Sequence, residues 1–122
     1  MNPFIPTEEK RALLIGRFQP PHHGHMEVVK HILWENEELV IGIGSAQESH
    51  TVDNPFTAGE RVLMLLKSLA EMRLDLSKIL IVPIPDINNN ALWVSHVLSF
   101  SPPFRVVYTR NPLVARLFKE AG

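Results

Sequence analysis

Residues 22–25 read His-His-Gly-His, and their residue types suggest chemistry more clearly than any other part of the chain. They follow a short apolar run, residues 12–15, and precede an amphipathic stretch, residues 24–34, which predicts a strand, a turn and a helix. The start of a helix carries unpaired N–H groups and a partial positive charge of about half a unit, so it attracts anions. Imidazole N–H groups and the permanent charge of Arg17 would strengthen that attraction. The loop is therefore predicted to bind phosphate.

Two other interpretations of the histidines are open on these residues alone. Imidazole is a common ligand of transition metals, so His22, His23 and His25 could bind a metal ion instead. Glu27 is the one carboxylate nearby in the sequence, which makes a full ligand set hard to assemble. The histidines could also be solvated loop residues without a ligand. Phosphate is favoured because it accounts for three features together: the helix start, the neighbouring arginine, and Gly24, which has no side chain to keep a phosphate from the backbone.

The elements that must position this loop alternate along the chain. Apolar runs predict strands at residues 12–15, 39–44, 79–84 and 105–108. Helical patterns occupy residues 24–34, 57–72 and 90–98, and a last helix begins at Asn111. This alternation predicts a parallel sheet with helices on both faces, a Rossmann-like doubly wound α/β domain. Ligands of such sheets bind beyond the carboxyl ends of the strands, where the strand order reverses, as it would between strands one and four in the order 3-2-1-4.

Two helix starts carry capping patterns that need no ligand to explain them. Thr57 and Glu60 have the spacing of a capping box. Asn111 suits an N-cap and Pro112 the first helical position. Arg61 is poorly placed for its helix dipole, which suggests that it pairs with a ligand or with a neighbouring group.

The composition limits the classes of protein that the chain could represent. Its 122 residues include 12 Lys and Arg against 13 Asp and Glu, so no overall positive field points to nucleic acid or to an anionic membrane. With 45% hydrophobic and 20% charged residues, the chain is expected to form one globular domain over residues 1–122. Cysteine is absent, which fits the cytoplasm. Residues 1–10 lack a signal-peptide pattern, and no apolar run approaches the roughly 20 residues that span a bilayer.

The histidine loop and its surroundings resemble a known family. Gly16-Arg17-Phe18-Gln19-Pro20, followed by His22-His23-Gly24-His25, is similar to the HxGH signature of the nucleotidyltransferase superfamily, in the form found in archaeal-type nicotinamide-nucleotide (NMN) adenylyltransferases. Segments 44–47, 54–61 and 86–93 resemble the same family, so the likeness covers about residues 11–122. It implies the nucleotidyltransferase fold and transfer of AMP from ATP to NMN, which gives NAD and pyrophosphate.

The resemblance also implies roles for individual residues. Catalysis would rest on His22, His25 and Arg17. ATP would be bound by Gly16, Phe18, Gly24, Thr109, Asn111 and Pro112. NMN would be bound by Ser45, Asp86, Ile87, Asn90 and Trp93. No metal ligand is implied within the protein, because Mg²⁺ would arrive on the ATP phosphates. The expected partners are the two substrates and further copies of the chain, as a hexamer.

The chemistry of the residue 86–93 segment fits a nicotinamide ring. A flat cationic ring is attracted to the face of an indole such as Trp93, by about 0.5–2 kcal/mol. Its carboxamide needs both a donor and an acceptor, which an Asn side chain or the strand-end backbone can supply. The structural alternative is that Trp93 belongs to the core and that the Asn run is only a loop.

The chain departs from the family in two places. It is expected to lack the C-terminal part of the family fold, where a further strand and a Ser/Thr-rich, Arg-containing helix start bind ATP phosphates. It also has Asp53 where some relatives place a basic residue. Two alternatives to NMN adenylyl transfer therefore stay open. One is a non-catalytic nucleotide-binding fragment, and the other is adenylyl transfer to a different phosphate-bearing acceptor.

Overall fold

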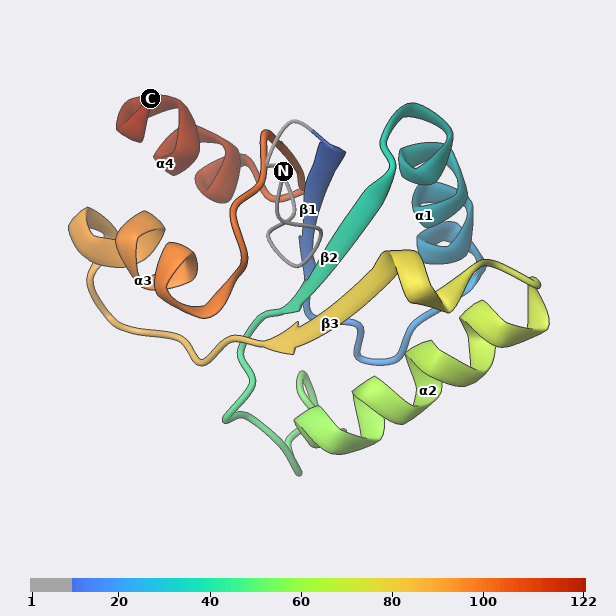
Figure 1. Ribbon diagram of the computed structural model, residues 1–122. Coiled ribbons are helices and arrows are strands. Elements are labelled where there is room, and N and C mark those ends of the chain that lie inside the picture. Colours follow the sequence, from blue (N-terminus) through green and yellow to red (C-terminus); the bar gives the residue numbers. More distant parts are fainter. Residues whose placement is uncertain (1–9) are drawn as a thin grey trace.

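The computed structural model describes residues 10–122, in which strands and helices alternate (Figure 1). The elements are β1 (Arg11–Gly16), α1 (His23–Glu35), β2 (Glu38–Ile43), α2 (Ala58–Glu71), the 3₁₀ helix η2 (Leu76–Lys78), β3 (Ile79–Pro83), the 3₁₀ helix η3 (Asn90–Leu92), α3 (Trp93–Phe100), β4 (Val106–Tyr108) and α4 (Pro112–Ala121). The predicted absence of a signal peptide concerns residues 1–10, of which 1–9 lie outside the described part. No helix within residues 10–122 is long and apolar enough to cross a membrane.

The four strands form one parallel sheet in the order β3-β2-β1-β4. Leu13 of β1 is in register with Val40 of β2 on one side and with Val107 of β4 on the other. The chain moves outward from β1 to β2 and β3, then returns to place β4 beside β1. The predicted doubly wound fold is therefore confirmed, and the order 3-2-1-4 that the sequence analysis took as its condition is the observed one, with the reversal between β1 and β4.

Both faces of the sheet are covered, and each carries its own apolar cluster. On one face Ala12 and Leu14 of β1 pack with residues of α1 and α2, among them Ile32 and Leu65. On the other face Leu13 and Ile15 pack in a cluster that includes Val97 of α3 and Val114 of α4. Because successive side chains of a strand point to opposite faces, a continuous apolar run is what a strand buried on both faces requires. Figure 1 shows α1 and α2 on one side of the sheet and α3 and α4 on the other.

The boundaries differ from the sequence-based ones by one or two residues, except in one place. The helix predicted over residues 90–98 is η3 followed by α3, which runs on to Phe100. The Asn89 side chain accepts a hydrogen bond from the backbone of Ala91, and this tight first turn explains the 3₁₀ start. Both predicted caps are confirmed: Thr57 exchanges bonds with Glu60, and Asn111 accepts from the start of α4.

Candidate active site

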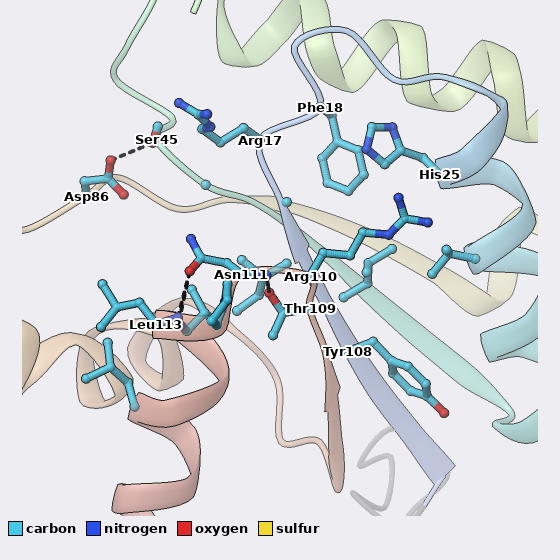
Figure 2. A pocket seen from close by; sticks show the side chains of 18 of the residues that line it. Arg17, Phe18, His25, Ser45, Asp86, Tyr108, Thr109, Arg110, Asn111 and Leu113 are labelled. Atoms are coloured by element: carbon cyan, nitrogen blue, oxygen red, sulfur yellow. Dashed lines mark hydrogen bonds between the residues drawn. The ribbon is translucent and has the colours of Figure 1, made fainter. Parts of the chain in front are cut away.

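A crevice of about 1310 Å³ lies at the carboxyl ends of the strands, where the fold predicts a ligand. Every residue proposed from the sequence lines it except His22. The residues concerned are Gly16, Arg17, Phe18, Gly24, His25, Ser45, Asp86, Ile87, Asn90, Trp93, Thr109, Asn111 and Pro112. Figure 2 shows how several of these side chains face the same space from the ends of different strands.

His25 is held in one orientation and in one tautomer. Its Nδ1 accepts a hydrogen bond from the backbone N–H of His22 at 3.0 Å, so the ring proton must lie on Nε2 when the imidazole is neutral. The ring of His22 stacks on that of His25, with centroids 3.7 Å apart, and the Phe18 ring meets it edge-on at 4.7 Å. His22 is exposed and lies outside the crevice lining, so it contacts His25 and not the crevice.

The pKa of His25 is lowered from 6.5 to about 4. Burial is the largest cause, because it disfavours the charged imidazolium, and the positive fields of His22 and Arg110 add to the effect. At neutral pH the His25 ring is therefore uncharged, and it offers an Nε2–H donor to the crevice.

Two glycines leave room for the rings around His25. A Cβ on Gly24 would lie 2.8 Å from Cε1 of His22, and one on Gly16 would lie 3.1 Å from the Phe18 ring. The sequence suggested that Gly24 keeps the backbone accessible to phosphate, and the structure adds that Gly24 makes space for the histidine stack. Phe18 is 2% exposed and has a φ of 54°, a conformation that costs free energy in a residue other than glycine.

Arg61 explains how the loops at this edge are held. Of the two roles expected from sequence, pairing with neighbouring groups is confirmed and pairing with a ligand is wrong. The side chain is 0% exposed and does not line the crevice, so it is not a ligand-binding residue. Its guanidinium donates to backbone carbonyls at the ends of β1 and β2 and in the loop between β2 and α2. The acceptors are the carbonyl oxygens of Arg17, Gly44, Ser45, Ala46, Glu48 and Thr57, at 2.9–3.5 Å. Five N–H donors in a rigid fork make Arg suited to this task, which the sequence pattern could not reveal.

A second tie joins the histidine loop to the loop before α2. The Gln19 side chain donates to the carbonyl of Phe56 and accepts from its N–H, at 3.1 and 2.9 Å. Arg17 is exposed and makes a 3.4 Å hydrogen bond to the side chain of Asn54. Its guanidinium therefore lies at the rim of the crevice with most of its donors available.

Ser45, Gln47 and Asp86 connect the ends of β2 and β3. The Ser45 hydroxyl donates to a carboxylate oxygen of Asp86 at 2.6 Å (Figure 2). The Gln47 side chain accepts from the backbone N–H of Asp86 at 2.9 Å, which fixes the position of that residue. Ser45 has a φ of 50°, so its backbone also adopts the unusual left-handed conformation.

Trp93 belongs both to the crevice and to the core. It is half-buried, lines the crevice, and packs edge-on against Phe118 of α4 with ring centroids 5.8 Å apart. The preceding segment is fixed by His96, whose Nε2 is 2.6 Å from the carbonyl oxygen of Pro85. The two interpretations of Trp93 offered by the sequence are therefore compatible in this structure.

The loop after β4 forms the opposite wall. Thr109 accepts from the N–H of Asn111, whose side chain accepts from the N–H groups of Leu113 and Val114. Arg110 lies between Thr109 and Asn111 and also lines the crevice. The sequence pattern did not identify it as a site residue. Its position directly after a strand was the available signal, since every other motif of the site follows a strand end.

A metal-binding histidine cluster finds no support in the geometry. Within residues 10–122 no group of three or more His, Asp or Glu side chains is arranged to hold a metal ion. His22 and His25 are stacked face to face, with one ring nitrogen of His25 already occupied by a backbone N–H.

Comparison with known proteins supports the resemblance drawn from the motifs. The chain is 61% identical over 115 residues to the nicotinamide-nucleotide adenylyltransferase of Archaeoglobus fulgidus, covering 92% of this chain and 66% of that protein. It is 61% identical over 113 residues to the enzyme of the same name from Thermoplasma acidophilum, covering 93% of this chain and 62% of that protein. The chain thus spans 62–66% of the length of these two relatives.

The fold also matches a solved structure. A bifunctional NMN adenylyltransferase/ADP ribose pyrophosphatase from Francisella tularensis, crystallised with AMP and a manganese ion, aligns with a TM-score of 0.76 and 25% identity. The match covers 92% of this chain and 35% of that one. The cytidylyltransferase-like family model matches residues 13–121, which include all four strands from Leu13 onward and every residue that lines the crevice. The chain belongs to the cytidylyltransferase-like family of nucleotidyltransferases.

Proposed function

We propose that this chain transfers AMP from ATP to nicotinamide mononucleotide, giving NAD and pyrophosphate. The observation that carries the proposal is one crevice lined by the start of α1, with Gly24 and His25, and by residues of the Asp86–Trp93 segment. Relatives that are 61% identical bear the name of this activity, which supports it.

The reaction needs alignment and charge stabilisation more than it needs a base. The phosphate of NMN has a second pKa near 6, so it is mostly dianionic at neutral pH and can attack the α-phosphorus of ATP directly. The Nε2–H of His25 and the guanidinium of Arg17 would stabilise the charge that develops on the phosphoryl oxygens. His22 is assigned a positioning role, because it stacks on His25 and is exposed outside the crevice.

ATP would lie along the β1–β4 side of the crevice. The backbone at Gly16, Phe18 and Gly24 would meet its phosphates, and the adenosine would lie beside Thr109 and the Asn111–Pro112 helix start. Mg²⁺ would enter as part of the MgATP substrate. Because the described residues offer no cluster of carboxylates, its ligands would be mainly phosphate and water oxygens.

NMN would lie toward the ends of β2 and β3. Backbone N–H groups of the Ser45 loop would meet the NMN phosphate, and the Ser45 hydroxyl would add a donor by turning away from the Asp86 carboxylate. The ring would stack on Trp93, with its carboxamide bound by Asn90 and by the backbone around Asp86 and Ile87. Assembly into a hexamer, by resemblance to the archaeal family, and a location in the cytoplasm, which the absence of cysteine fits, complete the proposal.

The test is direct formation of NAD by the purified 122-residue chain supplied with ATP, Mg²⁺ and NMN. We expect NAD by chromatography, at least a 100-fold lower rate in His25→Ala through loss of oriented stabilisation, and an unchanged rate in His23→Ala, since His23 lies outside the crevice lining. Near-normal NAD formation by His25→Ala would contradict the assigned role of this residue.

Parallel reactions separate the alternatives. Nicotinic acid mononucleotide and phosphopantetheine, offered as acceptors, would identify transfer to a different phosphate if either outperforms NMN. Calorimetric binding of ATP without product from any acceptor would favour a non-catalytic nucleotide-binding module.

A further inference from the structure

We propose that Arg110 is a phosphate-binding residue, which holds the polyphosphate of the nucleotide against His25 from the opposite wall of the crevice. The inference deepens the proposed function and takes from it only that the ligand is ATP. The first observation is the direction in which the Arg110 side chain extends. Figure 2 shows Arg110 extending from the end of β4 toward His25, on the other side of the crevice from Ser45 and Asp86.

The second observation is that this guanidinium has no protein partner. Within the described part of the chain, five of the other six arginines donate to carbonyls, amides or carboxylates; these are Arg11, Arg17, Arg61, Arg105 and Arg116. The sixth, Arg73, also has no side-chain partner among these residues, but it is exposed and lies outside the crevice lining. Arg110 forms no hydrogen bond or ion pair with residues 10–122, although it lines the crevice. An arginine has five N–H donors, and a phosphate group can accept two of them at once.

The third observation is the charge around it. The titratable side chains that line the crevice are Arg17, His25, Glu27, His31, Asp86, Tyr108 and Arg110. Asp86 already accepts from Ser45 at the far end, and Glu27 is exposed on α1 and makes no ion pair in the described residues. Figure 2 shows Arg17 on the side of Ser45 and Asp86, whereas Arg110 extends toward His25. Arg110 and the start of α1 therefore lie beside His25, so the space between His25 and Arg110 favours an anion.

The lowered pKa of His25 agrees with this geometry. The field of Arg110 is the smallest of the causes that keep the imidazole neutral, after burial and His22, and this agrees with the direction of the Arg110 side chain in Figure 2. A neutral Nε2–H donor and a permanent cation would then face the same phosphoryl oxygens. Positive charge in this position would stabilise the negative charge that develops on the leaving pyrophosphate.

Calorimetric titration of the 122-residue chain with ATP, inorganic tripolyphosphate and adenosine tests the proposal. We expect Arg110→Gln to raise the Kd values of ATP and tripolyphosphate about tenfold or more, because a charge-assisted contact to phosphate is lost. The Kd of adenosine should stay within about twofold of the wild-type value. The ATP affinity of Arg110→Lys should lie between those of the wild type and Arg110→Gln, since lysine keeps the charge and loses the paired donors. Arg116→Gln is the matched control, because Arg116 is an exposed arginine of α4 that pairs with Glu120 outside the crevice.

Three results would overturn the proposal: unchanged ATP affinity in Arg110→Gln, an equal loss for adenosine, or a parent chain that binds neither ATP nor tripolyphosphate. Failure of the proposed function is a separate outcome. If no NAD forms but ATP binding still depends on Arg110, the phosphate-binding role stands while the reaction assigned to the site does not.

Discussion

At the scale of single residues, the site depends on an imidazole that stays uncharged. His25 receives a backbone N–H on one nitrogen and is stacked on His22, while burial and neighbouring positive charge keep it neutral. A neutral ring presents a fixed N–H donor whose protonation does not change near pH 7. That arrangement suits a group whose task is to bind phosphoryl oxygens.

The lowered pKa of His25 should be visible in the pH dependence of the free energy of unfolding. The pKa of His25 is about 4 in the folded chain and 6.5 without the fold, so the unfolded chain takes up this proton first as the pH falls. The contribution of His25 to stability is therefore complete above pH 6.5, is lost between pH 6.5 and about 4, and is constant below that. Urea unfolding between pH 7.5 and 4 should show wild type losing stability relative to His25→Gln, whose side chain can still accept from the His22 N–H. Parallel curves for the two proteins would contradict the lowered pKa.

Gly24 offers a second test at this scale. A Cβ there would lie 2.8 Å from the His22 ring, whose exposed side chain can swing away. Gly24→Ala should therefore keep or raise stability, because Ala is favoured in helices by up to about 1 kcal/mol, yet lower NAD formation about tenfold or more by releasing the ring stack.

Gly59→Ala is the control for this variant. Its added Cβ would meet nothing closer than 4.0 Å, so stability should be kept or raised with unchanged turnover. Equal activity of the two variants, measured beside unfolding midpoints, would contradict a role of Gly24 in turnover, whether through the ring stack or through access of phosphate to the backbone.

At the scale of elements, the loops of the site are fixed by one buried arginine on α2. Arg61 gathers carbonyls from the ends of β1 and β2 and from the loop between β2 and α2, which together carry Arg17 and Ser45. Burial lowers the pKa of its guanidinium, with the field of Arg17 as a smaller cause, but the carbonyl dipoles around it suit a cation. Through Arg61, α2 thus fixes loops that line the crevice, although Arg61 itself does not line it.

Replacing this residue should affect stability and binding together. Arg61→Lys loses most of the fixed donors and leaves buried carbonyls unpaired, so we expect a loss of about 3 kcal/mol or more in the free energy of unfolding. The Kd for ATP should rise as well, because the loops lose their anchor. Arg116→Lys, at an exposed site, should change neither the urea midpoint nor the Kd. A stable Arg61→Lys variant with normal ATP affinity would show that the network is dispensable.

The sequence predicts elements better than it predicts such networks. Apolar runs, the Thr57 and Asn111 caps, and alternation of strands with helices were sufficient for the doubly wound fold and for the edge where the crevice lies, whereas the strand order entered only as a condition and is supplied by the structure. Arg61 could not be assigned, because its acceptors come from segments far apart in the sequence and arginine is rarely buried. The direction of Arg110 depends on the backbone after β4, which no residue pattern specifies.

At the scale of the whole molecule, the sheet is held between two clusters that share its strands. Residues of one strand alternate between the clusters, so neither can be lost while the other stays intact. Both clusters therefore belong to a single cooperative unit, and loss of packing in one should weaken the whole fold.

Two leucines on α2 provide a matched test of this core. Leu65 is fully buried and Leu63 is 53% exposed. Leu65→Ala should cost about 2–5 kcal/mol of unfolding free energy, against about 0.5 kcal/mol or less for Leu63→Ala. Circular dichroism and Trp fluorescence should report the same unfolding midpoint in each variant. Similar losses for the two leucines would contradict the assigned core, and separate midpoints would contradict a single unit.

The pairing of β1 with β4 has a consequence for how the crevice comes into being. Ala12 lies opposite Val106, so the first strand of the described chain finds its second neighbour only after more than ninety further residues. During synthesis on a ribosome, the histidine loop and α1 can form early, but one wall of the crevice does not yet exist. A nascent chain that ends before residue 106 is thus expected to lack the pocket, and nucleotide binding should begin only when the last strand and the start of α4 have emerged.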